Sequence, residues 1–176
     1  MKKQLIAAAA VVTGLTLAVA PTVDAMGKPG DQDIVTIAVE NGNFTTLVAA
    51  VGCADPAVGA ALTSGDKYTV FAPTDDAFMT TLGVDADSVC SLPQDLLTTV
   101  LLYHVTDGRR FSNSVVPKNM KPKTIETLSG IPFQVEKDLG IIDGNDVTEP
   151  SIVIPNINAS NGVIHAVDEV LLPINL

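Results

Sequence analysis

The stretch YTVFAPTDDAF, residues 68–78, contains the end of one secondary-structure element and the start of the next. Its first half is rich in aromatic and β-branched residues, which are typical of a strand, and Pro73 ends that run. Thr74 is a preferred N-cap residue, and Asp75 and Asp76 follow it, where the helix dipole favours negative charge. The stretch therefore predicts a strand that passes directly into a helix through a turn of fixed geometry.

Turns of this kind often carry phosphate sites or catalytic nucleophiles, but this one has the chemistry of neither. A phosphate-binding turn needs glycines so that several N–H groups can approach the phosphate, whereas this turn has no glycine and places two carboxylates there. A nucleophile elbow needs G-x-S-x-G, which the chain lacks. We interpret the threonine and the two aspartates as structural, and we expect Phe71 and Phe78 to enter the core from both sides of the turn.

Residues 1–25 have the pattern of a secretory signal peptide. Two lysines precede an apolar run over residues 5–20, which is shorter than the ~20 residues that a membrane span needs. We favour cleavage after the small residues VDA, before Met26; an uncleaved anchor is the alternative. Residues 26–32 then form a flexible leader. We expect an exported protein, periplasmic, on the cell surface or extracellular, with no stable membrane span after cleavage.

The chain is strongly acidic, with a formal net charge of −10. The signal segment carries two lysines and Asp24, so its removal lowers the net charge by one, to −11. Such a protein repels nucleic acid and anionic lipid over most of its surface. We therefore expect no nucleic-acid partner.

Cys53 and Cys90 are the two cysteines of the chain. In an oxidising compartment, a pair of thiols usually becomes a disulfide. A redox or metal pair would favour C-x-x-C spacing and further ligands, which the sequence does not offer. We predict a structural disulfide between these two residues.

Predicted helices come first along the chain and predicted strands come later. Apolar spacing predicts helices at 34–41, 44–52, 56–65, 75–83 and 93–105, with Asp33, Asn43 and Asp55 as caps of the first three. β-Branched runs predict strands at 67–72, 124–130, 132–138, 151–159 and 162–172. This segregation indicates a single α+β domain over residues 33–176, with helices covering an antiparallel or mixed sheet. A doubly wound nucleotide-binding fold would need a strict βαβαβ order, which is absent.

Three elements resemble the fasciclin-like domain family, in its bacterial, exported, single-domain form. TVFAPTDDAF (69–78) resembles the first family signature, NGVIHAVDEVLLP (161–173) the second, and LLYHV (101–105) the tyrosine–histidine element. Order and spacing agree over residues 33–174. The resemblance implies a compact β-sandwich or wedge with helices packed over it. It also implies cell–cell, matrix or polysaccharide contact at a surface rather than catalysis. Asp107 stands where relatives often have proline, a small departure.

The three matching elements must meet in space for such a fold to close. We therefore expect five apolar residues to share one core: Phe71, Phe78, Leu101, Val163 and Ile164.

Two groups of residues are candidates for contact with a partner, which we expect to be a protein or polysaccharide at the cell surface or matrix. The resemblance implies that Tyr103 and His104 form part of an adhesion surface; the alternative is a partly buried histidine bonded to backbone, with the tyrosine packed on the core. Five of the ten basic residues gather within fifteen positions, either as a patch for an acidic partner or as an ordinary solvated loop. These five are Arg109, Arg110, Lys118, Lys121 and Lys123.

Nothing in the sequence predicts a catalytic, cofactor or metal site. His104 and His165 are far apart in sequence, and no nucleophile motif supports a triad. We predict a non-enzymatic interaction module. Two alternatives stay open: an exported hydrolase or transferase with a non-motif site, and a small carrier that binds an apolar ligand between helices and sheet. A large enclosed pocket with converging polar groups would favour these alternatives, and a filled core with shallow grooves would favour the interaction module.

Overall fold

A four-stranded mixed sheet forms the centre of the molecule, which a computed structural model describes over residues 30–145 and 148–173. The strand order is β2-β1-β7-β6, in which β1 and β7 are parallel and the outer strands run antiparallel to them. The four strands are β1 (Tyr68–Pro73), β2 (Val105–Asp107), β6 (Ile152–Ala159) and β7 (Gly162–Val167). The predicted signal peptide and residues 26–29 of the leader lie outside the described residues.

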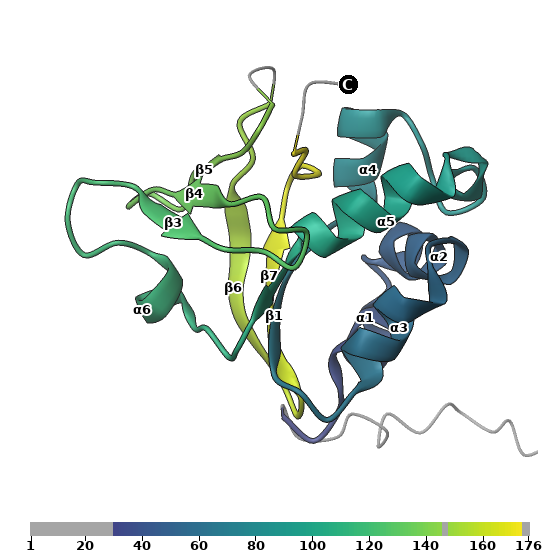
Figure 1. Cartoon of the computed structure of the whole chain (residues 1–176), viewed down its shortest axis with the longest axis horizontal. Coiled ribbons are helices and arrows are strands. Elements are labelled where there is room, and N and C mark those ends of the chain that lie inside the picture. The colour runs from purple at the N-terminus through teal and green to yellow at the C-terminus, as the bar shows by residue number, and fades with distance from the viewer. Residues whose placement is uncertain (1–29, 146–147, 174–176) are drawn as a thin grey trace, which may run out of the picture.

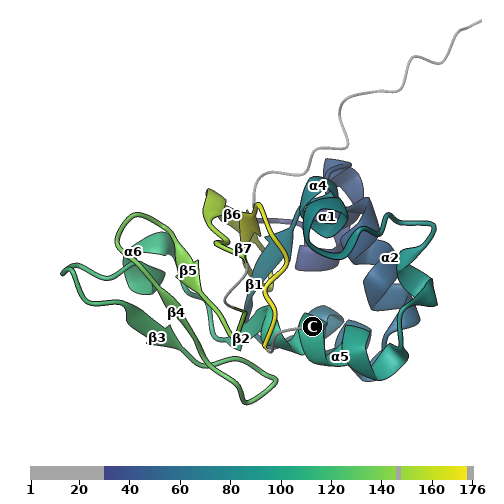
Figure 2. The same cartoon turned by 90° about the horizontal axis from the view of Figure 1, so that it is seen from above.

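A smaller antiparallel sheet, in the order β3-β4-β5, covers one face of this main sheet. Figure 2 shows the resulting three layers, with the small sheet on one side of the main sheet and most of the helices on the other. The strands of the small sheet are β3 (Lys123–Ile125), β4 (Phe133–Val135) and β5 (Ile141–Ile142). The predicted α+β architecture, with helices packed over sheet, is confirmed.

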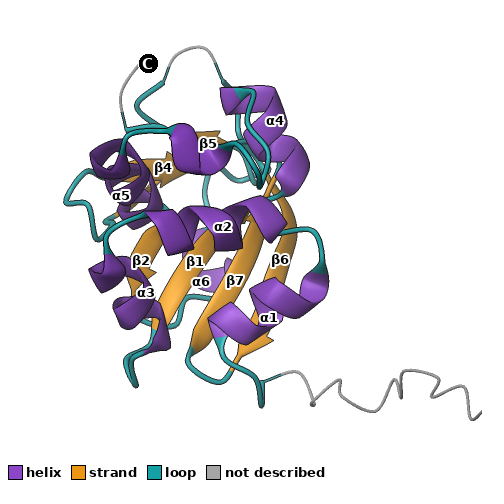
Figure 3. Ribbon diagram, turned by 90° about the vertical axis from the view of Figure 1, so that its right-hand side faces the viewer, coloured by secondary structure: helices purple, strands orange, loops and turns teal. Residues whose placement is uncertain are grey.

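Short helices cover the other face of the main sheet, and Figure 3 shows three of them, α1 to α3, lying across its strands. The helices of this layer are α1 (Ile34–Asn41), α2 (Thr45–Cys53), α3 (Pro56–Thr63), α4 (Asp75–Leu82) and α5 (Gln94–Tyr103). A 3₁₀ turn, η2 (Val89–Ser91), precedes α5. The short helix α6 (Ser112–Val115) lies on the side of the small sheet (Figure 1).

The main sheet separates two hydrophobic cores. Phe78, Leu101 and Ile164 belong to the core between the helices and the main sheet. Phe71 belongs to the second core, between the two sheets, where its ring meets Phe133 edge-on at 4.9 Å. The expectation of one shared core is therefore wrong for Phe71, and Val163, although buried, belongs to neither of the two cores. Successive side chains of a strand point to opposite faces, so the neighbours of Phe71 in β1 pack on the helices while its own ring packs on the small sheet.

Three of the predicted helix caps are confirmed. The Asp33 carboxylate accepts a hydrogen bond from the N–H of Thr36 at 2.7 Å at the start of α1. Asp55 accepts one from the N–H of Ala57 at 2.8 Å at the start of α3. Thr74 caps α4 through its hydroxyl, as the opening turn predicts.

The predicted cap at Asn43 is wrong, because a residue distant in sequence takes its place. Asp75 accepts hydrogen bonds from the N–H of Thr46 at 2.7 Å and from the hydroxyl of Thr45 at 2.8 Å, at the start of α2. Burial raises the pKa of Asp75, but these hydrogen bonds outweigh it and the pKa lies below its usual value. One carboxylate thus sits in the first turn of α4 and caps α2.

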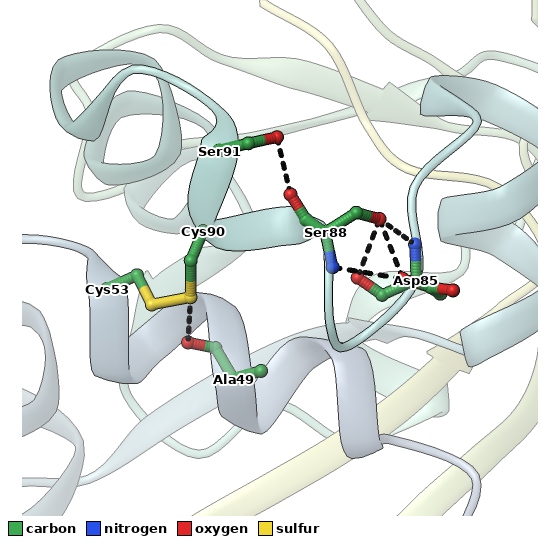
Figure 4. Close-up of a disulfide and its surroundings, with 6 residues drawn as sticks. All are labelled: Ala49, Cys53, Asp85, Ser88, Cys90 and Ser91. Carbon is green, nitrogen blue, oxygen red and sulfur yellow. Dashed lines mark hydrogen bonds between the residues drawn. A yellow bond between two sulfur atoms is a disulfide. The ribbon is translucent and has the colours of Figure 1, made fainter.

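A disulfide between Cys53 and Cys90 fastens the end of α2 to η2 (Figure 4). The two Cα atoms are 5.5 Å apart across a sequence separation of 37. The turn before η2 is fixed by Asp85, whose carboxylate accepts hydrogen bonds from the N–H of Ser88 at 3.0 Å and from its hydroxyl at 2.7 Å. The disulfide therefore joins two locally ordered segments.

The Asp75→Ala variant is expected to lose about 1–2 kcal/mol of unfolding free energy, because two donors at the start of α2 lose their acceptor. Asp76→Ala is the matched control. Asp76 is exposed in the same helix turn and its replacement removes only a helix-dipole contribution, about 0.3–1 kcal/mol. Urea unfolding of both variants measures the difference, and equal losses would contradict the capping role of Asp75.

Removal of the disulfide in a Cys53→Ala/Cys90→Ala variant is expected to lower the unfolding free energy by about 3–4 kcal/mol. The bond closes a long loop, so its loss returns chain entropy to the unfolded state. Chemical denaturation of the variant beside the oxidised protein measures this loss. An unchanged unfolding midpoint would show that the bond contributes no stability.

Candidate interaction surface

Tyr103 and His104, at the end of α5, are buried rather than exposed. The tyrosine has 0% of its surface exposed and the histidine 1%. The ring of Tyr103 meets that of Phe133 edge-on at 5.8 Å, and its hydroxyl donates to the carbonyl oxygen of Pro132 at 3.4 Å. Neither side chain can contact a partner in this conformation. This overturns the interpretation of the pair as an adhesion surface and agrees with the alternative, a histidine bonded to backbone beside a tyrosine packed on the core.

The His104 imidazole connects α5 to the chain that follows β7. Its Nδ1–H donates to the carbonyl oxygen of Val100 at 2.7 Å, and its Nε2 accepts from the N–H of Leu171 at 2.9 Å. Because Nε2 must stay unprotonated to accept, the ring is held neutral in one tautomer. Burial lowers the pKa of His104 to about 4, although the hydrogen bond to Val100 opposes this.

His165 plays a similar part on β7 with the opposite tautomer. Its Nε2–H donates to the carbonyl oxygen of Arg110 at 2.9 Å, and its Nδ1 accepts from the N–H of Asn156 at 3.3 Å. The ring also stacks on Phe71, with centroids 5.4 Å apart. Burial lowers the pKa of His165 as well. Both histidines therefore use both ring nitrogens to hold backbone.

Arg109 and Arg110 also bind the chain itself. The Nε–H of Arg109 donates to the carbonyl oxygen of Gly162 at 3.2 Å. Its Nη2 donates to Asn158 Oδ1 at 2.8 Å and to the carbonyl oxygen of Ala159. The Nε–H of Arg110 donates to the carbonyl oxygen of Asp107 at 3.0 Å. Much of the hydrogen-bonding capacity of the two arginines thus braces the β6–β7 hairpin and the turn after β2.

The three lysines of the basic segment gather around one hollow of about 360 Å³, between α6 and β3. Lys118 and Lys121 are exposed, whereas Lys123 is half-buried and donates through Nζ to the carbonyl oxygen of Ser114. The side chains of Asn113 and Asn119 line the same hollow. We call the segment 116–123, with this hollow, the lysine loop.

Acidic side chains gather at the other edge of the small sheet. Glu136, Asp138, Asp143 and Glu149 line a hollow of about 500 Å³ beside β5. Within residues 30–145 and 148–173, no three His, Cys, Asp or Glu side chains are grouped so that they could hold a metal ion. The small sheet therefore has a basic loop before its β3 edge and acidic groups at its β5 edge.

Comparison with known protein families assigns the chain to a family. The sequence model of the fasciclin domain matches residues 42–173. The chain belongs to the fasciclin domain family.

Several bacterial relatives of this fasciclin domain are similar over most of its length. Protein sll1483 of Synechocystis is 36% identical over 145 residues, which is 80% of this chain and 73% of that protein. Immunogenic protein MPB70 of Mycobacterium bovis is 33% identical over 157 residues, 87% of this chain and 76% of that protein. Cell surface glycolipoprotein MPB83 of the same species is 31% identical over 144 residues, 80% of this chain and 60% of that protein.

A solved structure supports the fold. A FAS1 domain pair from the insect cell adhesion molecule fasciclin I superimposes with a TM-score of 0.65, at 14% sequence identity. The match covers 81% of this chain and 51% of that domain pair, so the chain spans about half the length of that structure.

The family-matching elements of this fasciclin domain form its two central strands and the ends of two helices. The first signature supplies β1 and the start of α4, the second supplies β7, and the tyrosine–histidine element ends α5. No helix in the part of the chain that the structure describes is long and apolar enough to cross a membrane. The seven predicted contact residues differ in exposure: Lys118, Lys121 and Arg109 are exposed, Lys123 and Arg110 are half-buried, and Tyr103 and His104 are buried.

Acid is expected to weaken the fold through His104. The folded pKa of His104 is about 4 and the ordinary pKa of an unfolded histidine is 6.5, so the unfolded state takes up a proton first as the pH falls. This stabilisation is fully present above about pH 6.5 and declines towards pH 4, by about 2 kcal/mol between pH 7 and pH 5.

A His104→Gln variant provides the test, because glutamine does not titrate. Urea unfolding at pH 7, 6 and 5 should show a shallower fall in stability than in the parent protein, while His165 contributes equally to both. Parallel stability curves for the two proteins would exclude His104 as the source.

Proposed function

We propose that this protein is an exported, surface-associated interaction module that makes adhesive contacts with an acidic polysaccharide of the cell surface or matrix. The family assignment supports the general class, since similar chains include a cell surface glycolipoprotein and a cell adhesion molecule. The disulfide suits an oxidising compartment outside the cytoplasm. The predicted signal peptide, residues 1–25, would direct export.

The positive charge of the lysine loop is the reason for proposing an acidic polysaccharide as the partner. In a chain of net charge −10, three lysines around one hollow are where an acidic polymer approaches against the overall repulsion. Lys118 and Lys121 are exposed and supply point charges, while Asn113 and Asn119 offer amide groups beside them. The hollow is open and polar, which suits repeated contact with a chain of sugars more than enclosure of one small molecule.

The geometry of the histidines favours this proposal over a hydrolase or transferase. A general base needs a ring nitrogen that can reach a substrate proton. Both nitrogens of His104 and both of His165 bind backbone groups, and both rings are buried. We therefore assign no catalytic role to either residue.

Neutralising the exposed lysines is expected to weaken adhesion. Lys118→Gln/Lys121→Gln should reduce binding to heparin, used as an acidic polysaccharide probe, by roughly three- to tenfold at low salt. The dependence of the affinity on salt concentration should also become shallower, because exposed charges are screened beyond ~8 Å at physiological ionic strength. Immobilised heparin with a salt series measures both effects.

A matched control lowers the net charge equally at another site. Ala60→Glu/Gln94→Glu places two acids at exposed positions of α3 and α5, and should retain heparin binding. If the lysine variant bound as tightly as the parent, the lysine loop would not be the contact surface. If the two variants lost affinity equally, net charge rather than the loop would set binding. Binding to a surface protein in place of any acidic polysaccharide would replace the proposed partner class.

A further inference from the structure

The helical layer contains a partly open apolar cavity of about 200 Å³ that no contact described so far uses. It lies between helices α1, α2, α3 and the strands β1 and β2, on the face of the main sheet opposite the small sheet. Ile34, Leu47 and Val58 contribute from the three helices, and Val70 and Val105 from the strands. Figure 3 shows the helices α1 to α3 that cover this face.

The wall of the cavity is aliphatic apart from one imidazole, that of His104. Both nitrogens of this ring are occupied by the backbone of Val100 and Leu171. The ring therefore presents no unpaired polar atom to the cavity. A molecule inside would find only apolar surface to contact.

Water is unfavourable in such an apolar cavity. A buried water needs two to four polar partners, and apolar cavities of roughly 150 Å³ in other proteins stay dry and take up benzene or xenon. An empty cavity also forfeits the dispersion contacts of the atoms that line it. Filling it with an apolar molecule restores these contacts and removes apolar surface of that molecule from water.

One side of the cavity reaches the protein surface at the end of α2. Val35, Val48 and Val51 line the cavity and are half-buried, and Gly52 lines it and is exposed. Gly52 carries no side chain and a Cβ added there would meet nothing within 4 Å, so no side chain covers the cavity at this position. The surrounding helices have eight or nine residues, a length at which helices depend on packing and not on intrinsic stability. We therefore expect a molecule to enter from this side with only a small displacement of α1 or α2.

We propose that this cavity is a binding site for a small uncharged apolar molecule, of the size of one aromatic ring or a short alkyl chain. The site is separate from the lysine loop and lies on the opposite face of the main sheet. A charged ligand is excluded, because a buried ion would meet no polar partner in this cavity. The volume of the cavity limits the size of the ligand, because it is only somewhat larger than that of cavities that hold one benzene ring.

Titration of the oxidised, exported protein with toluene tests the proposal, with methyl NMR signals of isoleucine, leucine and valine as the readout. Saturable shifts confined to the methyl groups around the cavity are expected, with a dissociation constant on the order of 1 mM or tighter. Benzoate, which has the same ring and a charge, is expected to bind at least tenfold more weakly. No saturable shift with toluene, or equal binding of benzoate, would overturn the proposal.

Filling the cavity provides the second test. Val58→Phe, at a buried position of α3 that lines the cavity, is expected to reduce toluene affinity at least tenfold and to keep or raise the melting temperature. Val39→Phe is the matched control, because Val39 is exposed on α1 and does not line the cavity. Ala38→Leu fills the cavity from α1 instead and replaces Val58→Phe if that variant does not fold. Equal toluene binding by the parent and a folded filled variant would place the ligand elsewhere.

The end of a lipid acyl chain offers the same chemistry as a free apolar molecule. Sedimentation with neutral phosphatidylcholine vesicles distinguishes the two sources. Vesicle binding by the parent that is lost in Val58→Phe would identify an acyl chain as the natural occupant. Absence of vesicle binding, together with saturable toluene binding, would identify a free molecule.

Discussion

The parallel pairing of β1 with β7 is the interaction on which the rest of the fold depends. It runs in register from Tyr68 opposite Gly162 to Pro73 opposite Val167, and it joins parts of the chain that are about ninety residues apart. Gly162 is required for this approach, because a Cβ there would lie 2.1 Å from the Tyr68 carbonyl oxygen and 2.6 Å from Ile34 Cδ1. Any side chain at this position would separate the two central strands and displace α1.

Buried polar side chains fix the layers to this strand pair. Asn161 accepts from the N–H of Ile34 at 2.8 Å and donates to the carbonyl oxygen of Leu62 at 2.7 Å, so it holds the start of α1 and the end of α3. His104 and His165 hold the chain after β7 and the turn after β2 in the same way. Each side chain satisfies backbone groups that would otherwise be buried without partners. These three residues of the family-matching elements therefore maintain the architecture.

The two sites that we propose use opposite faces of the main sheet and different physics. Binding to the lysine loop depends on long-range attraction between exposed charges, which salt screens. Binding in the apolar cavity depends on short-range contacts and on the volume of single side chains such as Val58. A charge change in the loop should not alter the cavity, because solvent and the main sheet separate them, so each site can be tested with the other intact.

Local patterns in the sequence determined most of the secondary structure, the caps at Asp33, Asp55 and Thr74, and the α+β layering. These features depend on residues close together in the chain, where hydrogen-bonding preference and apolar spacing act directly. The pairing of Cys53 with Cys90 was also predictable, because no other thiol competes. The resemblance of three motifs supplied the family.

For the remaining residues, only the tertiary structure decided on which face of the sheet they lie and which groups they contact. Asp75 caps a helix thirty residues before it, Phe71 packs in a second core, and Tyr103 and His104 are buried rather than presented. Each outcome depends on which backbone group or aromatic ring lies beside the side chain in the folded protein. These contact partners are distant in sequence, so the residues adjacent in the chain do not specify them. The cavity arises in the same way, since it is the space that three short helices leave above a sheet whose strands come from opposite ends of the domain.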